Sequence, residues 1–267
     1  MLDWNLHCAQ MPEPLAISCF IITKNEADRL QRTLQSVLGL VEQIVVVDSG
    51  STDQTVAIAK LENATVLHKN WQGFGPQKRF AEDQCTHDWV LNLDADEVLT
   101  TELADEIRSL FANGPPKMSG VRFRQTTVYP QQQTPRLWAD SHNYIRLYDR
   151  TKMRFSASPS HDAVDPGRHK ILQLRHPALH YSWRSLSHLT SKYDAYTDLQ
   201  AATFTRKSPI ILYFRLLTEF PVHFIKTYLF RRHITGGRHG LAVSFVIARA
   251  RWRRIKKLLQ TTKQSLQ

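Results

Sequence analysis

The sequence predicts an α/β protein in which helices flank a mostly parallel sheet and a basic, helical appendage follows. Three observations predict this class. Short apolar segments alternate with segments of helical periodicity in the first part of the chain. Each of these apolar segments ends in polar residues. Positive charge is concentrated after residue 205, in a region that also carries many aromatic and aliphatic side chains.

Length and composition are those of a globular protein. The chain has 267 residues, of which 42% are hydrophobic, enough for one sizeable α/β domain and an appendage. We expect an N-terminal extension at 1–14, a sheet-containing domain at 15–205 and a basic helical tail at 206–267. The first 14 residues lack the basic segment and apolar run of a signal peptide. Three cysteines without metal-ligand spacing predict reduced thiols in a cytoplasmic protein.

The first predicted strand covers residues 16–22, an apolar run in which Cys19 is expected to lie in the core. It leads directly into the polar residues Thr23, Asn25 and Glu26. Apolar residues at helical spacing follow from Leu30 onward, which predicts a helix after this polar loop.

The second predicted strand covers residues 44–47 and runs into a loop that contains Asp48, Ser51 and Asp53. Gly50 permits a tight backbone path in this loop. Ser51 or Thr52 is expected to cap a helix that begins near residue 54, where free amides would face polar ligand groups. The alternative is a well-capped loop that binds nothing.

The third predicted strand begins at Trp89 and delivers Asp94 and Asp96 to its own C-terminal end. Open α/β sheets bind ligands at this end of their strands. Carboxylates two residues apart on a straight strand face opposite ways, so both reach one ligand only if the chain turns there. Mg²⁺ and Mn²⁺ favour one or two carboxylates together with phosphate oxygens, which suits a nucleotide diphosphate. The alternative is a solvated acidic turn before a helix.

The three strand ends are expected to share one rim, because right-handed crossovers between parallel strands point those ends the same way. Residues 120–124 and 143–148 alternate between polar and apolar, and we expect them to extend the sheet.

These motifs resemble inverting glycosyltransferases of family 2, which have the GT-A nucleotide-sugar-binding fold. The resemblance covers about residues 15–165 and rests on four segments in the same order: Ile21–Glu26, Val46–Asp53, Gly75–Ala81 and Leu93–Glu97. It implies a nucleotide-diphospho-sugar donor, a Mg²⁺ or Mn²⁺ ion and a glycan or lipid-linked acceptor. The Lys-Asn-Glu form of the first motif, the later His-Asp pair and the basic tail look closest to the subgroup that builds lipopolysaccharide core or related surface glycans.

The resemblance also implies which residue is the catalytic base. Asp162 stands where this family carries its catalytic acid, and a base must take the proton of the acceptor hydroxyl. His161 would orient Asp162 or bind the diphosphate, and Asp165 is the nearest rival. The alternative is that Asp162 caps a turn and His161 is an ordinary loop residue.

Further roles follow from the same resemblance. Asp48 would contact the nucleotide base or ribose, Asp94 the ribose or donor sugar, and Asp96 the metal. Lys78 and Arg79 would contact polar groups of the nucleotide, unless they lie on the solvated face of a helix. The remaining residues expected to bind the donor lie in the first two loops and are Thr23, Asn25, Glu26, Ser51 and Asp53.

The tail is the basic part of the chain. Residues 206–267 hold 14 Lys and Arg against one acid, whereas residues 1–205 hold 21 against 23. Charged residues interrupt every apolar run before it reaches the about 20 residues that span a bilayer. We therefore expect an amphipathic element on an anionic membrane surface, and a cytoplasmic protein peripheral on the inner face of the cell membrane. A basic helix that packs on the catalytic domain is one alternative, and nucleic-acid binding is a less favoured one.

Two other functions are alternatives to sugar transfer. A sugar nucleotidyltransferase would ordinarily have a glycine-rich, basic triphosphate loop after the first strand, and residues 23–26 contain no glycine. A nucleic-acid-binding protein would share its basic surface between both halves, but residues 1–205 are slightly acidic. Within the tail, residues 236–240 are glycine-rich and predict a turn between two helices.

Overall fold

The computed structural model describes residues 13–158, 163–202 and 208–264, and of residues 199–202 and 262–264 it describes the backbone alone. The chain forms two compact units. The first comprises Met1–Gln125 and Ser141–His180, and the second comprises Thr126–Asp140 and Tyr181–Gln267. The expected boundary between residues 205 and 206 falls outside the described residues, so that division of the chain stays a prediction.

One sheet runs through the first unit, with the strand order β3-β2-β1-β4-β7-β6-β9-β5 and with β8 paired to β6. Strands β1 to β4 pair in parallel, whereas β7 is antiparallel to β4 and β9 is antiparallel to β5. The strands are β1 Leu15–Thr23, β2 Val41–Asp48, β3 Thr65–His68, β4 Trp89–Asp94, β5 Glu97–Leu99, β6 Gly120–Thr127, β7 Ser141–Asp149, β8 Ile171–Gln173 and β9 Ala178–His180. The predicted mostly parallel sheet, and its extension by the 120–124 and 143–148 segments, are confirmed.

The strand register brings the predicted polar ends together. Thr23 of β1 pairs with Asp48 of β2, and Ile22 of β1 pairs with Asp94 of β4. Because these strands are parallel, their C-terminal ends form one rim of the sheet. The prediction that three strands end along one rim is therefore confirmed.

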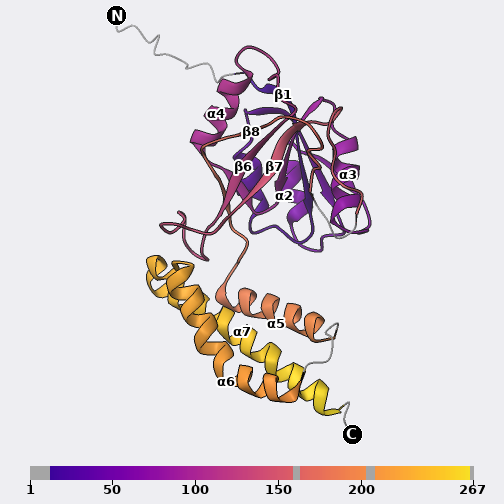
Figure 1. The fold of residues 1–267 in the computed structure, drawn as a ribbon. Helices are drawn as coiled ribbons and strands as arrows, with labels where there is room; N and C mark the ends of the chain where they lie inside the picture. Colours follow the sequence, from indigo (N-terminus) through magenta and orange to yellow (C-terminus); the bar gives the residue numbers. More distant parts are fainter. Residues whose placement is uncertain (1–12, 159–162, 203–207, 265–267) are drawn as a thin grey trace, which may run out of the picture. The chain divides into compact units, whose positions relative to one another are not determined.

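Both faces of the sheet are covered, because alternate residues of each strand face opposite sides. Ile17, Cys19 and Ile21 of β1 belong to the cluster that includes α1 and α4, whereas Phe20 belongs to a second cluster that includes α3. Figure 1 shows α3 and α4 on opposite sides of the sheet. The helices of this unit are α1 Leu30–Gln35, α2 Thr55–Leu61, α3 Phe74–Asp83 and α4 Thr101–Phe111.

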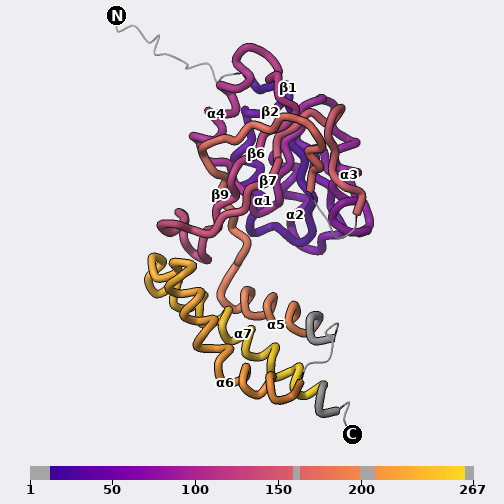
Figure 2. Tube along the Cα trace, in the orientation of Figure 1, coloured from indigo at the N-terminus to yellow at the C-terminus, as the bar shows by residue number. Residues whose placement is uncertain are grey.

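The second unit is helical, and Figure 2 traces α6 and α7 lying side by side. Leu212 of α6 packs with Ile255, Leu258 and Leu259 of α7. Tyr129 ties the Thr126–Asp140 segment to this unit, because its hydroxyl lies 2.6 Å from His233 Nδ1 and its ring stacks on Trp183. The elements are α5 Leu186–Ala202, α6 Pro209–Ile225, the π-helix η1 Lys226–Phe230, the 3₁₀-helix η2 His233–Gly236 and α7 Gly237–Gln264.

Several local predictions can be compared with these elements. The glycine-rich turn is confirmed, since Gly237 has a positive φ of 54° and separates η2 from the body of α7. The expected cap of α2 is wrong. Neither Ser51 nor Thr52 caps that helix, because the side chain of Asp53 accepts the Thr55 amide instead. Among the described residues, no helix has both the length and the apolar character needed to cross a membrane.

Candidate active site

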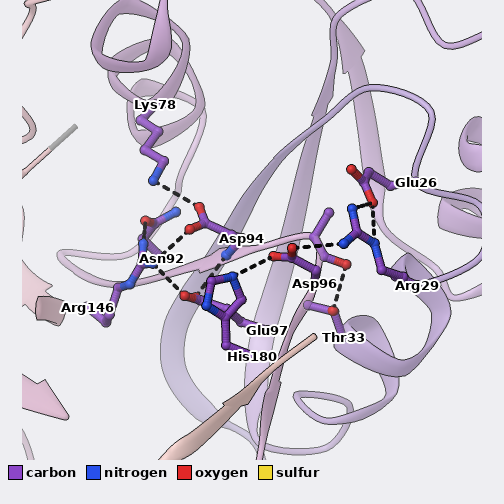
Figure 3. A network of polar contacts seen from close by, with 11 residues as sticks. Glu26, Arg29, Thr33, Lys78, Asn92, Asp94, Asp96, Glu97, Arg146 and His180 are labelled. Carbon is purple, nitrogen blue, oxygen red and sulfur yellow. Dashed lines mark hydrogen bonds and ion pairs between the residues drawn. The ribbon is translucent and has the colours of Figure 1, made fainter. Parts of the chain in front are cut away.

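The chain turns between the two carboxylates, as the spacing requires. β4 ends at Asp94 and β5 begins at Glu97, so Ala95 and Asp96 form the connecting turn. The hydroxyl of Thr33 in α1 donates a hydrogen bond of 3.0 Å to the carbonyl of Ala95 and fixes this turn. Figure 3 shows the resulting cluster of polar side chains at the rim.

Two cations hold the Asp94 carboxylate. Lys78 Nζ lies 2.9 Å from Oδ1, and Arg146 Nη2 lies 2.8 Å from Oδ2. Burial alone would raise the pKa of Asp94, but Arg146 and then Lys78 outweigh it and hold the pKa far below its ordinary value. The Asp94 side chain is still 32% exposed. It is thus a carboxylate that favours its charged form, is fixed in orientation and is open to a ligand.

Arg146 organises the inner part of the cluster from β7. Its guanidinium donates to Asn92 Oδ1 at 2.6 Å, to Asp94 at 2.8 Å and to Glu97 Oε1 at 2.6 Å. Glu97 is only 1% exposed, and this burial raises the pKa of its carboxyl to about 6 despite the charge of Arg146. The other Glu97 oxygen accepts the Asp94 amide at 3.1 Å. Arg146 therefore stabilises two neighbouring carboxylates in one orientation.

Asp96 lies between two other basic side chains. Arg29 Nη1 is 3.0 Å from Oδ2, and His180 Nε2 is 3.5 Å from Oδ1. Burial opposes ionisation, but the hydrogen bond and charge of His180, and then Arg29, lower the pKa of Asp96. The reciprocal contact with Asp96 raises the pKa of His180 against the effect of burial. The Asp96 carboxylate in this turn therefore stabilises positive charge close to it.

The loops after β1 and β2 are linked to each other. The Asn25 amide donates to Ser51 Oγ at 2.8 Å, and Asn25 Oδ1 accepts from the Thr52 amide at 2.8 Å. Asn25 has a φ of 57°, a left-handed conformation that Asn tolerates better than most residues. The Glu26 amide donates to Thr55 Oγ1, and the Glu26 carboxylate accepts from Arg29. These contacts join the two predicted donor-binding loops to each other.

The acids of the second loop shape that loop. Asp48 is buried, and its Oδ2 accepts the amides of Gly50 and Ser51, both at 2.9 Å. Gly50 has a φ of 87°, which allows the tight turn that these bonds close. Asp53 accepts the Ala27 amide at 3.2 Å. Burial slightly opposes the charge of Asp53, but hydrogen bonds from Thr55 and Ala27 lower its pKa.

Helix α3 supplies two of the predicted residues in different ways. Lys78 is 1% exposed and lies 5.2 Å from the centre of the Phe155 ring, so the alternative that it lies on a solvated face is wrong. Arg79 donates to the Phe155 carbonyl at 2.7 Å. Gly75 lies so close to the 156–158 backbone that a Cβ there would come within 2.4 Å of the Ser156 oxygen. α3 therefore also positions the segment that leads to residue 159.

A cavity of about 430 Å³ opens beside the cluster. Asp94, Glu97 and His180 line one part of it, and Phe155 with Val164 lines another. Side chains and backbone of β6 and β7 complete it, namely Arg122, Gln125, His142, Asn143, Tyr144, Ile145 and Arg146, together with Ala163. The cavity lies within the first unit and brings the carboxylates to a space large enough for a sugar.

The predicted base, Asp162, and its neighbour His161 lie outside the described residues. The residues on either side are described: Phe155 bridges to Val164, and the Ser156 amide donates to the Ala163 carbonyl at 3.1 Å. The rival base, Asp165, is exposed and accepts the Gly167 amide at 2.9 Å, as a turn-forming Asp does.

Four ionisable residues of the cluster were not predicted from the sequence, namely Arg29, Glu97, Arg146 and His180. Arg146 and His180 come from β7 and β9, far from the acidic turn in sequence, and no local motif marks them. Glu97 follows Asp96 directly, but its burial could not be seen from the sequence. Arg29 lies three residues after Glu26, and the two side chains form an ion pair in the loop just before α1.

Within the described part of the chain, no three His, Cys, Asp or Glu side chains are grouped as a protein-only metal site would need. Mg²⁺ commonly uses one or two carboxylates and completes its shell with substrate phosphates and water.

Comparison with known proteins gives the family. The sequence profile of Glycosyl transferase family 2 matches residues 18–168. A glycosyltransferase of Rickettsia felis is 38% identical over 258 residues, which cover 93% of this chain and 91% of that protein. The lipopolysaccharide core biosynthesis glycosyltransferase LpsC of Rhizobium meliloti is 28% identical over 220 residues, which cover 80% of this chain and 81% of LpsC.

Among solved structures, the crystal structure of S. aureus TarS 1–349 is similar at 14% identity, with a TM-score of 0.47, over 94% of this chain and 91% of that one. The family assignment rests on the two sequence comparisons, because the profile covers more than half of the chain and the Rickettsia relative covers nearly all of it. The chain belongs to glycosyltransferase family 2 and is a glycosyltransferase.

Proposed function

We propose that this glycosyltransferase moves a sugar, with inversion, from a nucleotide-diphospho-sugar to a glycan or lipid-linked acceptor. One observation carries the proposal. Asp94 and Asp96 are delivered to one rim by a turn, and basic side chains keep both ionised beside a cavity that fits a sugar. A sugar nucleotidyltransferase is disfavoured by the first loop, where residues 23–26 lack the glycines that would cradle a triphosphate.

We assign the donor to the rim of the parallel strands. Asp48, with Ser51 and Asp53 of its loop, would meet the nucleoside, and Asp94 would meet the ribose or donor sugar. Thr23 supports this assignment, because its hydroxyl is buried and has no hydrogen-bond partner among the described residues. Asn25 and Glu26 would act by holding the second loop in place.

The sequence predicts that Lys78 and Arg79 contact the nucleotide. Their contacts instead favour a role in which each holds another part of the site in place. Lys78 ion-pairs with Asp94, so it would fix the carboxylate that meets the sugar. Arg79 holds the Phe155 carbonyl and would fix the wall of the cavity.

We propose Asp96 as the ligand of a Mg²⁺ or Mn²⁺ ion, with His180 close enough to contribute a nitrogen. The carboxylate oxygen suits either ion. The imidazole nitrogen, 3.5 Å away, would bind only after it loses the proton that the contact with Asp96 favours, and both side chains are partly exposed. When bound, the ion would neutralise the charge that develops on the leaving diphosphate.

The protein must also remove the proton of the acceptor hydroxyl. We propose that Asp162 takes this proton while the hydroxyl oxygen bonds to the anomeric carbon and the bond to the diphosphate oxygen breaks. Support comes from the cavity, since Ala163 and Val164, which follow Asp162 in sequence, line it together with Asp94. In Asp162→Asn, we expect donor binding to persist and transfer to fall by about 10² to 10⁴. Full activity in that variant would move the role to Asp165.

We further propose lipopolysaccharide core or a related envelope glycan as the product, and the inner face of the cell membrane as the place of work. The similarity to LpsC supports the first statement. The positive charge of the tail supports the second, because the cytoplasmic face of a membrane is anionic.

A screen of nucleotide-sugars for thermal stabilisation tests the donor proposal. A ligand at about 100 times its Kd adds about 2.7 kcal/mol to the free energy of unfolding. We expect one nucleoside diphosphate and its sugars to stabilise the protein with Mn²⁺ present and much less after chelation. If no nucleotide-sugar raises the melting temperature in either condition, the proposal is wrong.

A further inference from the structure

Helix α6 exposes apolar residues and buries its acidic residue, which is the reverse of an ordinary surface helix. Its most exposed residues are apolar: Ile210 is 80% exposed, Phe214 is 68% exposed and Leu217 is 79% exposed. Its acid, Glu219, is only 5% exposed. Helices of globular proteins normally bury their apolar stripe and expose their charges. The arrangement here therefore needs an explanation outside the folding of the helix itself.

Four of the exposed apolar residues lie on one side of α6. Ile210, Phe214, Leu217 and Ile225 recur at intervals that keep them on one side of a helix, and Phe230 of η1 is 79% exposed. We call these five residues the α6 face. The opposite side of α6 carries Leu212, which is buried against α7. Several large apolar side chains exposed on one side of a helix are typical of an interaction site.

Charge decides which partner the α6 face fits. The second unit has 17 Lys and Arg against four acids. Each of the four acids is ion-paired within the unit: Glu219 with Arg215 at 2.7 Å, Asp140 with Arg136 at 3.1 Å, Asp194 with Arg253, and Asp198 with Lys257.

Unpaired positive charge lies next to the α6 face in sequence. Lys226, Arg231 and Arg232 are exposed and form no ion pair with a carboxylate of the described residues, although Arg232 lies over the Trp138 ring at 4.9 Å. A second copy of the chain would bring the same positive charge to this face, which disfavours self-association. An anionic surface with an apolar interior would satisfy both the charge and the apolar side chains.

We propose that the α6 face docks on an anionic lipid membrane, with its apolar side chains in the headgroup and acyl boundary and the three cations at the headgroups. The helix would lie in the plane of the membrane, because α6 has only 17 residues and carries Arg215 and Glu219 in its middle. The proposal rests on the membrane location proposed above and identifies the residues that would contact the membrane. It does not depend on the identity of the sugar donor.

Vesicle co-sedimentation of the full chain tests the proposal. We expect binding at low salt to vesicles of phosphatidylcholine with phosphatidylglycerol, weak binding to phosphatidylcholine alone, and release as salt rises. The double substitution Phe214→Ser with Leu217→Ser should lower the partition coefficient by about tenfold or more, since two large apolar side chains no longer insert. Its matched control is Leu38→Ser with Leu61→Ser in the first unit, where the side chains are 43% and 81% exposed.

The charge is tested separately. Replacing Lys226, Arg231 and Arg232 by Glu should weaken binding by about fivefold or more for each charge. The control with the same change of net charge replaces Lys117, Arg168 and Lys170, which are exposed in the first unit. Thermal melting of every variant checks that the fold survives.

The proposal is overturned if the full chain ignores anionic vesicles at low salt, or if the control variants lose binding as much as the α6 variants. It is also overturned if the full chain does not bind vesicles and sedimentation velocity instead reveals a dimer that the Leu217→Ser substitution dissociates. No nucleotide-sugar enters this assay. A failed donor screen therefore leaves the lipid result intact, and the reverse also holds.

Discussion

The contacts of Arg146 give a prediction whose size can be worked out from the structure. This guanidinium is 5% exposed and donates to Asn92, Asp94 and Glu97 at 2.6 to 2.8 Å. In Arg146→Met, the two carboxylates would remain together with less positive charge nearby. Removing one partner from a buried ion pair costs about 3–5 kcal/mol of folding free energy, because the other charge is left uncompensated. We expect a loss of this size.

Denaturant unfolding at neutral pH measures the loss, and two further variants test its cause. Glu97→Gln removes one of the two charges that Arg146 compensates, so Arg146→Met with Glu97→Gln should recover about 1 kcal/mol or more of the loss. Arg122→Met is the matched control, because that arginine is exposed and should change stability by about 0.5 kcal/mol or less. If Arg146→Met unfolds at the parent's denaturant midpoint, or if Glu97→Gln deepens its loss, our reasoning about the buried charges is refuted.

Two further predictions concern packing and thiol reactivity. Gly75→Ala should destabilise the protein by about 1–3 kcal/mol and reduce transfer, because its Cβ would meet backbone oxygens within 2.4 Å. Gly120→Ala should be milder, because its Cβ meets the flexible end of Met153, and equal denaturation midpoints for the two variants would contradict this difference. Burial raises the pKa of the Cys85 thiol to about 12 and that of Cys19 well above its ordinary value, so both stay protonated at neutral pH. In a Cys8→Ser variant, iodoacetamide should therefore label neither cysteine until the protein unfolds, and rapid labelling of the folded protein would refute the burial argument.

The sequence predicts the structure best where a strand and the polar loop after it are contiguous in the chain. The apolar runs before Thr23, Asp48 and Asp94 predict both the parallel strands and their common rim, because strand and loop are contiguous in the chain. The turn between Asp94 and Asp96 was likewise predictable from the spacing of the two acids.

The partners of those acids were not predictable. Arg146 and His180 reach the turn from β7 and β9, so only the register and order of the sheet bring them there. The capping prediction failed for a related reason. Asp53 and Thr55 bond to each other locally, while Ser51 and Thr52 bond to Asn25 across two loops. A sequence pattern cannot rank such competing hydrogen bonds.

Donor binding by the Asp96→Asn variant tests the central claim most directly. The nucleotide-sugar found by the thermal screen would be titrated calorimetrically into the parent, into Asp96→Asn and into Asp105→Asn, an exposed carboxylate of α4 that serves as the control. We predict that Mn²⁺ strengthens binding to the parent and to Asp105→Asn by about tenfold or more, equivalent to about 1.4 kcal/mol. In Asp96→Asn this enhancement should disappear, although the protein stays folded. Equal enhancement by Mn²⁺ in Asp96→Asn and in the parent would contradict the account.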